Sequence, residues 1–272
     1  MKTDFKTNIK AIIARAYVRV VAGNREPSWV ISETVLPLIS TAAFVYVYKA
    51  LNAPEEFTGF VVLGGAMSAY WMTVLWSMAA QFYWEKEIGN LDLYMIAPIS
   101  RMSILLGMAS GGFVYASVRA GSVFLLGSLI FKIDFGVIDF GRLFLIFILC
   151  QFALFGLGML FSSLFMIYGR EAWHGVSLFQ EPVYLLSGFY FPVKSLGFTL
   201  ALTASLIPLT LGLDGMRQLA FKKGVEMGFL NINLEIGILA FLCVFFMVAS
   251  HYALQFMENL GKKTGRLTLR WQ

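Results

Sequence analysis

The chain has 272 residues, of which 58% are hydrophobic, 16% aromatic and only 14% charged. Ordinary soluble domains carry about 25% charged residues, so this composition excludes a cytosolic globular protein. Lys and Arg outnumber Asp and Glu by 21 to 16, an excess that in a membrane protein is interpreted by its position relative to the spans. It does not indicate nucleic-acid binding. The two cysteines lie in apolar runs and predict no disulfide framework.

Residues 1–27 predict a helix that lies in the membrane interface. Apolar residues recur there at helical spacing beside a stripe of lysines four positions apart: Phe5, Ile9, Ile12 and Ile13, and Lys2, Lys6 and Lys10. A secretory signal would instead place an apolar core directly after a short basic start. A solvated basic leader is the alternative interpretation, and Pro27 is expected to begin the first span.

Long apolar runs predict an all-α polytopic membrane protein with six transmembrane helices. Four runs with at most one charge are each long enough to cross a hydrocarbon core about 30 Å thick: 29–48, 57–84, 102–131 and 143–168. A shorter fifth span is expected at 172–191, where Pro182 interrupts the run. A sixth is expected at 236–256.

The charge-free segment 195–213 has two possible topologies, because Gly197, Pro208 and Gly212 interrupt it. With six spans and both termini cytoplasmic, 13 basic residues lie inside and seven outside, whereas a seventh crossing would give 12 and eight. The positive-inside rule therefore favours six spans. We expect residues 192–222 to form an extracellular re-entrant pair of half-helices.

Motifs of enzymatic chemistry are missing from the sequence. No phosphate-binding GxxxxGK[ST] loop is present, and the nearest string, at 261–264, lacks the upstream glycine. The only histidines, His174 and His251, do not form an HExxH zinc motif. The sequence therefore predicts no catalytic residue and no metal site, and it favours transport over an enzymatic function.

Residues 85–101 form a short segment between two expected spans that is longer than a connector needs to be. It begins with acidic residues, and Pro98 closes it after an apolar middle that includes Leu91 and Tyr94. Exposing such apolar side chains to water is unfavourable, so we predict an amphipathic helix whose apolar face binds a partner protein. A helix that rests on the lipid surface is the alternative.

The pattern Glu85...Gly89...Leu91...Pro98...Arg101 resembles the intracellular loop of the type-2 ABC exporter permeases, although Asn90 stands where Thr is usual. A second signature is similar to the fifth span and the extracellular re-entrant turn of that family. It comprises Glu181-Pro182, the string from Leu186 to Val193, and a later stretch from Ile207 through Pro208 to Arg217. The resemblance covers nearly the whole chain.

The resemblance implies a drug- or antibiotic-exporter-like permease in the cell membrane, in which two permease subunits, identical or related, pair with two ATPase subunits. ATP and Mg²⁺ would bind to the ATPase partner and not to this chain. The implied coupling residues are Glu85, Glu87, Gly89, Leu91, Tyr94 and Pro98, and those of the re-entrant region are Pro192, Pro208 and Arg217. The expected cargo is a hydrophobic or amphiphilic small molecule. A lipid-linked glycan, or a carrier or channel that does not use ATP, is the alternative.

Ionisable residues within the expected spans are candidates for a transport pathway, because burying them is costly. Arg119 and Glu181 lie inside spans, and their pairing stays open. Glu181 is expected either to contact cargo or to cap the helix broken at Pro182, whereas Glu33 and Glu235 are expected near span ends.

A GxxxG motif, Gly107 to Gly111, predicts close helix packing within or between subunits. The basic tail, 258–272, is expected to rest on anionic lipid.

Overall fold

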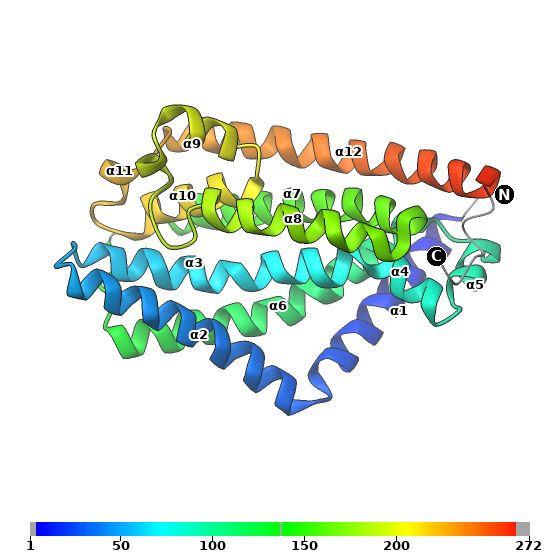
Figure 1. The fold of residues 1–272 in the computed structure, drawn as a ribbon, viewed down its shortest axis with the longest axis horizontal. Coiled ribbons are helices and arrows are strands. Elements are labelled where there is room, and N and C mark those ends of the chain that lie inside the picture. The colour runs from blue at the N-terminus through cyan, green and yellow to red at the C-terminus, as the bar shows by residue number, and fades with distance from the viewer. Residues whose placement is uncertain (1–3, 137, 265–272) are drawn as a thin grey trace.

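The computed structural model describes residues 4–136 and 138–264, and within these ranges every regular element is a helix. Most of the long helices run side by side along one long axis, whereas α1 (Phe5–Asn24) and α2 (Pro27–Ala50) run obliquely to it (Figure 1). The prediction of an all-α fold is therefore confirmed. Residues 265–272, which hold part of the predicted lipid-binding tail, lie outside the described ranges.

Five helices of the described residues are long and apolar enough to cross a membrane. They are α2 (Pro27–Ala50), α3 (Glu56–Met72) with its continuation η1 (Thr73–Ala79), α6 (Arg101–Phe131), α7 (Phe140–Tyr168) and α12 (Ile232–Thr264). A bent pair, α9 (Phe198–Ala204) and α10 (Pro208–Ala220), raises the number to six if it counts as one span.

α3 is the central helix of the bundle, and η1 extends it as a π-helix. Residues on nearly all sides of α3 are buried, as expected for a helix that is apolar all round. Trp71, Leu75, Leu154 and Phe165 are fully buried where α3 and η1 pack against α7. This rigid centre positions the elements at the two ends of the molecule.

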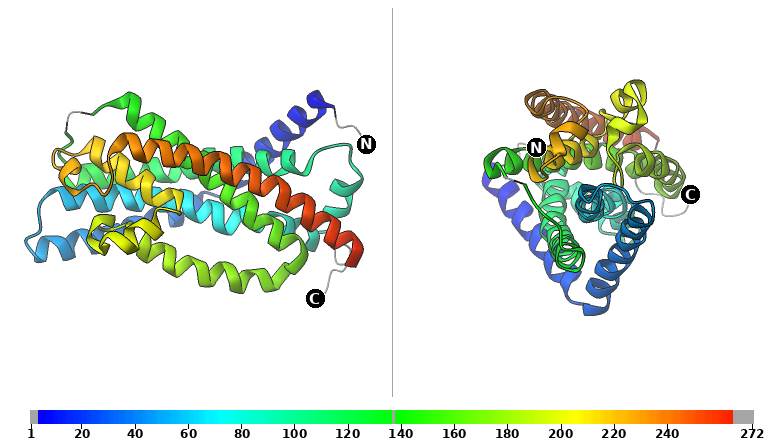
Figure 2. Two further views of the ribbon diagram at one scale, coloured as in Figure 1. Left: turned by 90° about the horizontal axis from the view of Figure 1, so that it is seen from above. Right: turned by 90° about the vertical axis from the view of Figure 1, so that its left-hand side faces the viewer.

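The two ends carry different elements. At one end, which we call the α5 end, lie α4 (Gln81–Glu87) and α5 (Leu91–Ile96) (Figure 1). At the other, the α9 end, lie η3 (Val193–Leu196), α9, α10 and α11 (Gly224–Met227). α1 (Phe5–Asn24) packs obliquely on α6 and meets α2 at a sharp corner near Pro27 (Figure 2). The predicted N-terminal helix is thus present, and its place in the interface stays a prediction.

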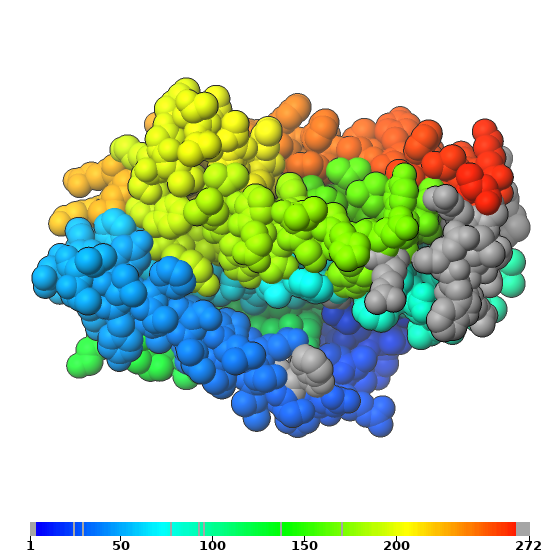
Figure 3. Space-filling view, in the orientation of Figure 1, coloured from blue at the N-terminus to red at the C-terminus, as the bar shows by residue number. Residues whose placement is uncertain are grey.

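The expected fifth span is shorter than predicted. After the 3₁₀ turn η2 (Gly169–Glu171), α8 runs only from Ala172 to Leu186. Its 15 residues span about 22 Å, less than a hydrocarbon core of about 30 Å. The helix ends because Gly188 has a φ of 66°, a left-handed conformation that breaks the helix. α8 lies uncovered on one face of the molecule (Figure 3).

α9 and α10 form a hairpin with a bend of 111°. The carbonyl of Pro208, at the start of α10, accepts a hydrogen bond from Cys150 Sγ at 3.6 Å. Cys150 lies ten residues, about 15 Å, from the start of α7. α10 therefore begins about one third of the way along α7 and runs back to the α9 end, which is the geometry of a half-helix.

Candidate functional site

The segment between η1 and α6 folds into two short helices joined by a tight turn. Gly89, at a φ of 79°, reverses the chain after α4, and the Asn90 amide donates to the Glu85 carbonyl at 2.8 Å. A side chain at Gly89 would strain this left-handed turn. α5 ends because Ala97, which precedes Pro98, adopts an extended conformation. The sequence-predicted residues Gly89 and Pro98 thus shape the segment.

Glu85 anchors this segment to α1. Its carboxylate is 3% exposed and forms an ion pair with Arg15, while Gln81 Nε2 and Asn90 Nδ2 also donate to it, the latter at 3.1 Å. The Arg15 guanidinium lies 5.9 Å from the centroid of the Tyr94 ring. Burial lowers the pKa of Arg15, and Tyr94 acts in the opposite direction. Arg15 therefore joins α1 to both α4 and α5.

The exposed apolar side chains of this segment are not the predicted ones. Leu91 is only 2% exposed and Tyr94 is half-buried, because these residues, three positions apart, share the face of α5 that packs on the core. Ile88, Leu93 and Ile96 are instead exposed, by 66%, 59% and 77%. The prediction of an exposed Leu91–Tyr94 face is therefore wrong. We call the exposed residues Ile88, Leu93, Ile96, Glu87 and Pro98 the coupling surface, after the role that the family resemblance implies for this segment and that stays a prediction.

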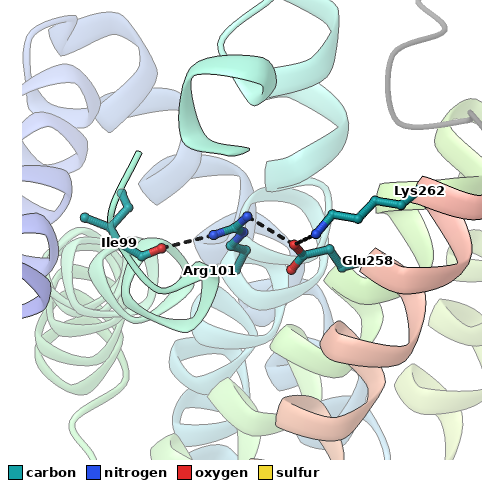
Figure 4. A network of polar contacts seen from close by, with 4 residues as sticks. All are labelled: Ile99, Arg101, Glu258 and Lys262. Carbon is teal, nitrogen blue, oxygen red and sulfur yellow. Dashed lines mark hydrogen bonds and ion pairs between the residues drawn. The ribbon is translucent and has the colours of Figure 1, made fainter. Parts of the chain in front are cut away.

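The coupling surface is connected to further helices at the start of α6. Figure 4 shows that Arg101 Nη1 donates to the Ile99 carbonyl at 3.2 Å and that Arg101 Nη2 lies 3.1 Å from Glu258 Oε1 of α12. Lys262 Nζ donates to the same carboxylate oxygen at 2.6 Å. The Ser100 amide donates to Asn8 Oδ1 of α1 at 2.8 Å. The segment that follows α5 is thus tied to α1 and α12.

The GxxxG motif of α6 packs directly against α1 of the same chain. A Cβ atom at Gly107 would lie 2.8 Å from the Ile12 carbonyl oxygen, and one at Gly111 would lie 2.7 Å from the Ala16 carbonyl oxygen. Both contacts are with backbone atoms, which cannot rotate away. The structure therefore resolves the alternative that the sequence left open, because the motif packs helices within one subunit.

Arg119 of α6 pairs with Glu33 of α2, and not with Glu181. The Arg119 guanidinium lies 3.2 Å above the centroid of the Tyr115 ring, and the Tyr115 hydroxyl donates to Glu33 Oε2 at 3.1 Å. Glu181 lies on the exposed side of α8, and within the described residues its carboxylate has no hydrogen bond or ion pair. A role for Glu181 in transport stays a prediction.

Arg217 holds the α9 end together. Its buried guanidinium donates to four carbonyl groups at 2.6–3.1 Å, those of Gly188, Phe189, Phe191 and Phe60. These acceptors come from α3 and from the link after α8. Pro192 lies in that link and precedes η3, whereas Pro208 is the first residue of α10. The predicted residues of the re-entrant region therefore lie in one compact unit.

Contacts of two lysines place both ends of the hairpin at the same end of the bundle. Lys194, before α9, donates to the Glu226 carbonyl at 2.8 Å. Lys222, after α10, forms an ion pair with Asp134 in the link between α6 and α7. The hydrogen bond that Lys222 donates to the Asp134 carboxylate raises the pKa of Lys222. The hairpin thus starts and finishes at the α9 end.

The ABC-2 type transporter family model matches residues 7–221. The chain belongs to the ABC-2 type transporter family. It is also 31% identical over 115 residues to the probable multidrug ABC transporter permease YbhR of Escherichia coli K12, and equally to that of Escherichia coli O157:H7. These matches cover 41% of the chain and 30% of each relative. The chain is thus a membrane protein of a transporter family.

This ABC-2 permease also has a buried polar cluster behind the hairpin. Glu235 of α12, expected near a membrane interface, is fully buried. Gln218 Nε2 lies 3.1 Å from Glu235 Oε1 and 3.0 Å from Asp214 Oδ2, and Asp214 also accepts from the Phe229 amide at 2.8 Å. The cluster therefore fastens α10 to α12 and to the segment that precedes α12.

Sequence reasoning missed the partners of the polar residues in this permease. Arg15 and Glu85 lie 70 positions apart, and the Glu33–Arg119 pair is equally remote in sequence. For Glu33 and Arg119 the available signal was a lone charge within an apolar run, which requires a partner but does not name it. Only the helix packing selects that partner.

Proposed function

We propose that this chain is the permease subunit of an ATP-driven exporter of a hydrophobic or amphiphilic small molecule. Two ATPase subunits, which bind ATP and Mg²⁺, and a second permease subunit would complete the transporter. The coupling surface carries this proposal, because three large aliphatic side chains are exposed at one end on a segment that buried contacts hold in place. An exposed apolar patch of this kind fits a docking partner.

The proposed mechanism transmits ATPase motion along the contacts of the α5 end. A displacement of the α4–α5 segment would move α1 through the Glu85–Arg15 ion pair. The movement would then reach α6, because α1 packs closely on Gly107 and Gly111. The Arg101–Glu258 ion pair extends the path to α12. Motion at the coupling surface would therefore tilt α1, α6 and α12 together.

The proposed transport pathway involves the exposed face of α8. Leu178 and Leu185 are 77% and 61% exposed, and Glu181 lies on the same uncovered helix (Figure 3). A 15-residue helix that exposes His174 and Ser177 as well as Glu181 among its apolar side chains is poorly suited to contact lipid alone. We propose that a second permease subunit faces α8 and that cargo passes between the two. The name of the relatives, multidrug permeases, supports a drug-like cargo.

The proposed orientation places the α5 end and both termini in the cytoplasm of a cell-membrane protein. The distribution of basic residues supports this orientation, since the six-span arrangement places more of them at the α5 end. The hairpin of α9 and α10 would then enter the membrane from outside and return.

Copurification tests the docking role of the coupling surface. The tagged chain is purified from its native membrane, and P-loop ATPases bound to it are identified and quantified by mass spectrometry. Ile88→Asp and Leu93→Asp should reduce the bound ATPase at least about tenfold, since each places a charge in an apolar contact worth about 1.4 kcal/mol or more. Val225→Asp is the matched control, because Val225 is 71% exposed at the opposite end.

Retention of the ATPase by both coupling-surface variants, at the level of the control, would contradict the docking role.

A transport assay in vesicles then separates the cargo classes. ATP-dependent export of a hydrophobic dye supports the proposed cargo, whereas export of only a lipid-linked glycan would overturn it.

A further inference from the structure

A cavity of about 540 Å³ lies between α1, α2, α6 and the junction of α3 with η1. α1 and α2 diverge from their corner, and α6 and α3 form the opposite side (Figure 2). The cavity is separate from the coupling surface. Its lining combines charged, aromatic and apolar side chains, which include Arg19, Glu33, Met72, Trp76, Tyr115 and Arg119.

The charges that line this cavity are mainly positive. Two guanidinium groups, of Arg19 and Arg119, accompany one carboxylate, of Glu33. Both guanidinium groups lie near the Tyr115 ring, that of Arg19 at 5.6 Å and that of Arg119 at 3.2 Å from its centroid, so two like charges repel each other there. An anion between the two guanidinium groups would reduce this repulsion.

Two buried polar atoms at the cavity have no hydrogen-bond partner among the described residues. They are Arg119 Nε and Thr73 Oγ1, and both side chains are more than nine-tenths buried. Buried donors without partners are rare because leaving them unpaired costs free energy. Both atoms can donate a hydrogen bond, so they favour a ligand with acceptor oxygens.

The remainder of the lining is apolar except for Ser68, and three of its apolar side chains are partly exposed on the outside of the bundle. Leu36, Met72 and Trp76 are 62%, 37% and 39% exposed. Thr73 and Trp76 belong to η1, the seven-residue π-helix. π-helical turns are uncommon and frequently occur at functional sites. An alkyl chain that leaves the charged part of the cavity would contact these three side chains.

We propose that this cavity binds the headgroup of an anionic amphiphile, a carboxylate or phosphate that carries an alkyl tail. The oxygens would lie between Arg19 and Arg119, and the tail would pass Leu36 and Trp76 toward lipid. The proposal does not depend on an ATPase partner or on export, so its test is a binding measurement on the permease alone. A cationic amphiphile does not fit, because it would meet the excess positive charge.

Fluorescence quenching measures this binding. The purified chain, in neutral detergent, is titrated with phosphatidylglycerol that carries brominated acyl chains, and Trp76→Phe identifies the part of the quenching that comes from the cavity. Lauryl phosphate, phosphatidylcholine and inorganic phosphate are then added as competitors. Lauryl phosphate should displace the probe, whereas phosphatidylcholine and inorganic phosphate should be at least tenfold weaker.

Variants test the role of the two arginines. Arg19→Gln, and the double variant Arg119→Gln/Glu33→Gln, which leaves no unpaired carboxylate, should each weaken probe binding at least tenfold. Arg142→Gln, an exposed arginine on α7, is the control and should bind normally. Circular dichroism and size exclusion verify that each variant is folded.

Wild-type affinity in both folded arginine variants would overturn the proposal, as would equal competition by phosphatidylcholine. Competition by inorganic phosphate as strong as that of lauryl phosphate would overturn the role of the tail. If lauryl phosphate competes but brominated phosphatidylglycerol binds outside the cavity, with quenching unchanged in Trp76→Phe, the ligand is a single-chain amphiphile and not a bilayer lipid. If lauryl phosphate and brominated phosphatidylglycerol both bind in the cavity, the cavity accepts a bilayer lipid as well as a single-chain amphiphile.

Discussion

The Arg15–Glu85 ion pair is expected to couple α1 energetically to the α4–α5 segment, and a double-mutant cycle measures this coupling. Arg15→Met keeps the length of the side chain and removes its charge, whereas Glu85→Gln keeps the shape and removes the charge of the acceptor. The two single variants and the double variant complete the cycle. The Arg15 side chain is 21% exposed and that of Glu85 only 3%, so the pair is largely shielded from water.

The expected magnitude follows from this burial. Removing one partner of a fully buried pair costs about 3–5 kcal/mol, and the partial exposure of Arg15 reduces the expected cost of each single variant to about 2–4 kcal/mol. The double variant should cost less than the sum of the singles, because neither charge is left unpaired, with a coupling energy of about 1.5–3 kcal/mol. Arg142 and Asp139, exposed by 53% and 51%, form the control pair, for which about 0.2–1 kcal/mol is expected.

The assay is reversible unfolding of the purified chain in mixed micelles, followed by the fluorescence of its tryptophans. The coupling of the ATPase is measured in parallel, as ATP hydrolysis stimulated by cargo. Additivity of the two single variants within about 0.5 kcal/mol would refute the reasoning, because independent sites add within that range. A coupling energy as small as that of the Arg142–Asp139 control pair would also refute the reasoning.

Four further outcomes are expected. Gly111→Ala should cost about 1–3 kcal/mol of unfolding free energy, because its Cβ would overlap the backbone of α1, whereas Gly121→Ala, which has open space on the same helix, should be neutral or stabilising. Arg217→Lys should lower the unfolding temperature in a thermal melt, because an ammonium group cannot reach the four carbonyl groups that the guanidinium satisfies. Lys222→Cys should react with an impermeant maleimide from outside intact cells, and labelling only after permeabilisation would mean an additional crossing. Glu181→Gln should change the export of cationic cargo without a change in stability; normal export of every cargo by this variant would exclude charge recognition.

The sequence by itself determined that the fold is all-helical and where the five long apolar helices lie, but not that α8 is shorter than a span. Long apolar runs cannot be solvated, and a chain in lipid must satisfy its backbone groups within the segment, so composition and length were sufficient. The end of α5 before Pro98 was equally accessible, because the residue before a proline avoids the helical conformation. The single amphipathic helix expected over residues 85–101 was wrong, because Gly89 reverses the chain and divides the segment into α4 and α5. The family resemblance of residues 85–101 depends on these same local features.

Only the tertiary structure decided which side chains of these helices face one another. Leu91 and Ile88 are both aliphatic, and their sequence does not show that the first packs on the core while the second is exposed. The GxxxG motif required a close neighbour, and the structure identified it as α1. Glu33 was paired with Arg119 by the packing of α2 on α6, although the two lie far apart in the chain. The physical reason is that periodicity reports the conformation of a single segment, whereas contacts depend on the relative rotation and depth of helices that are distant in sequence.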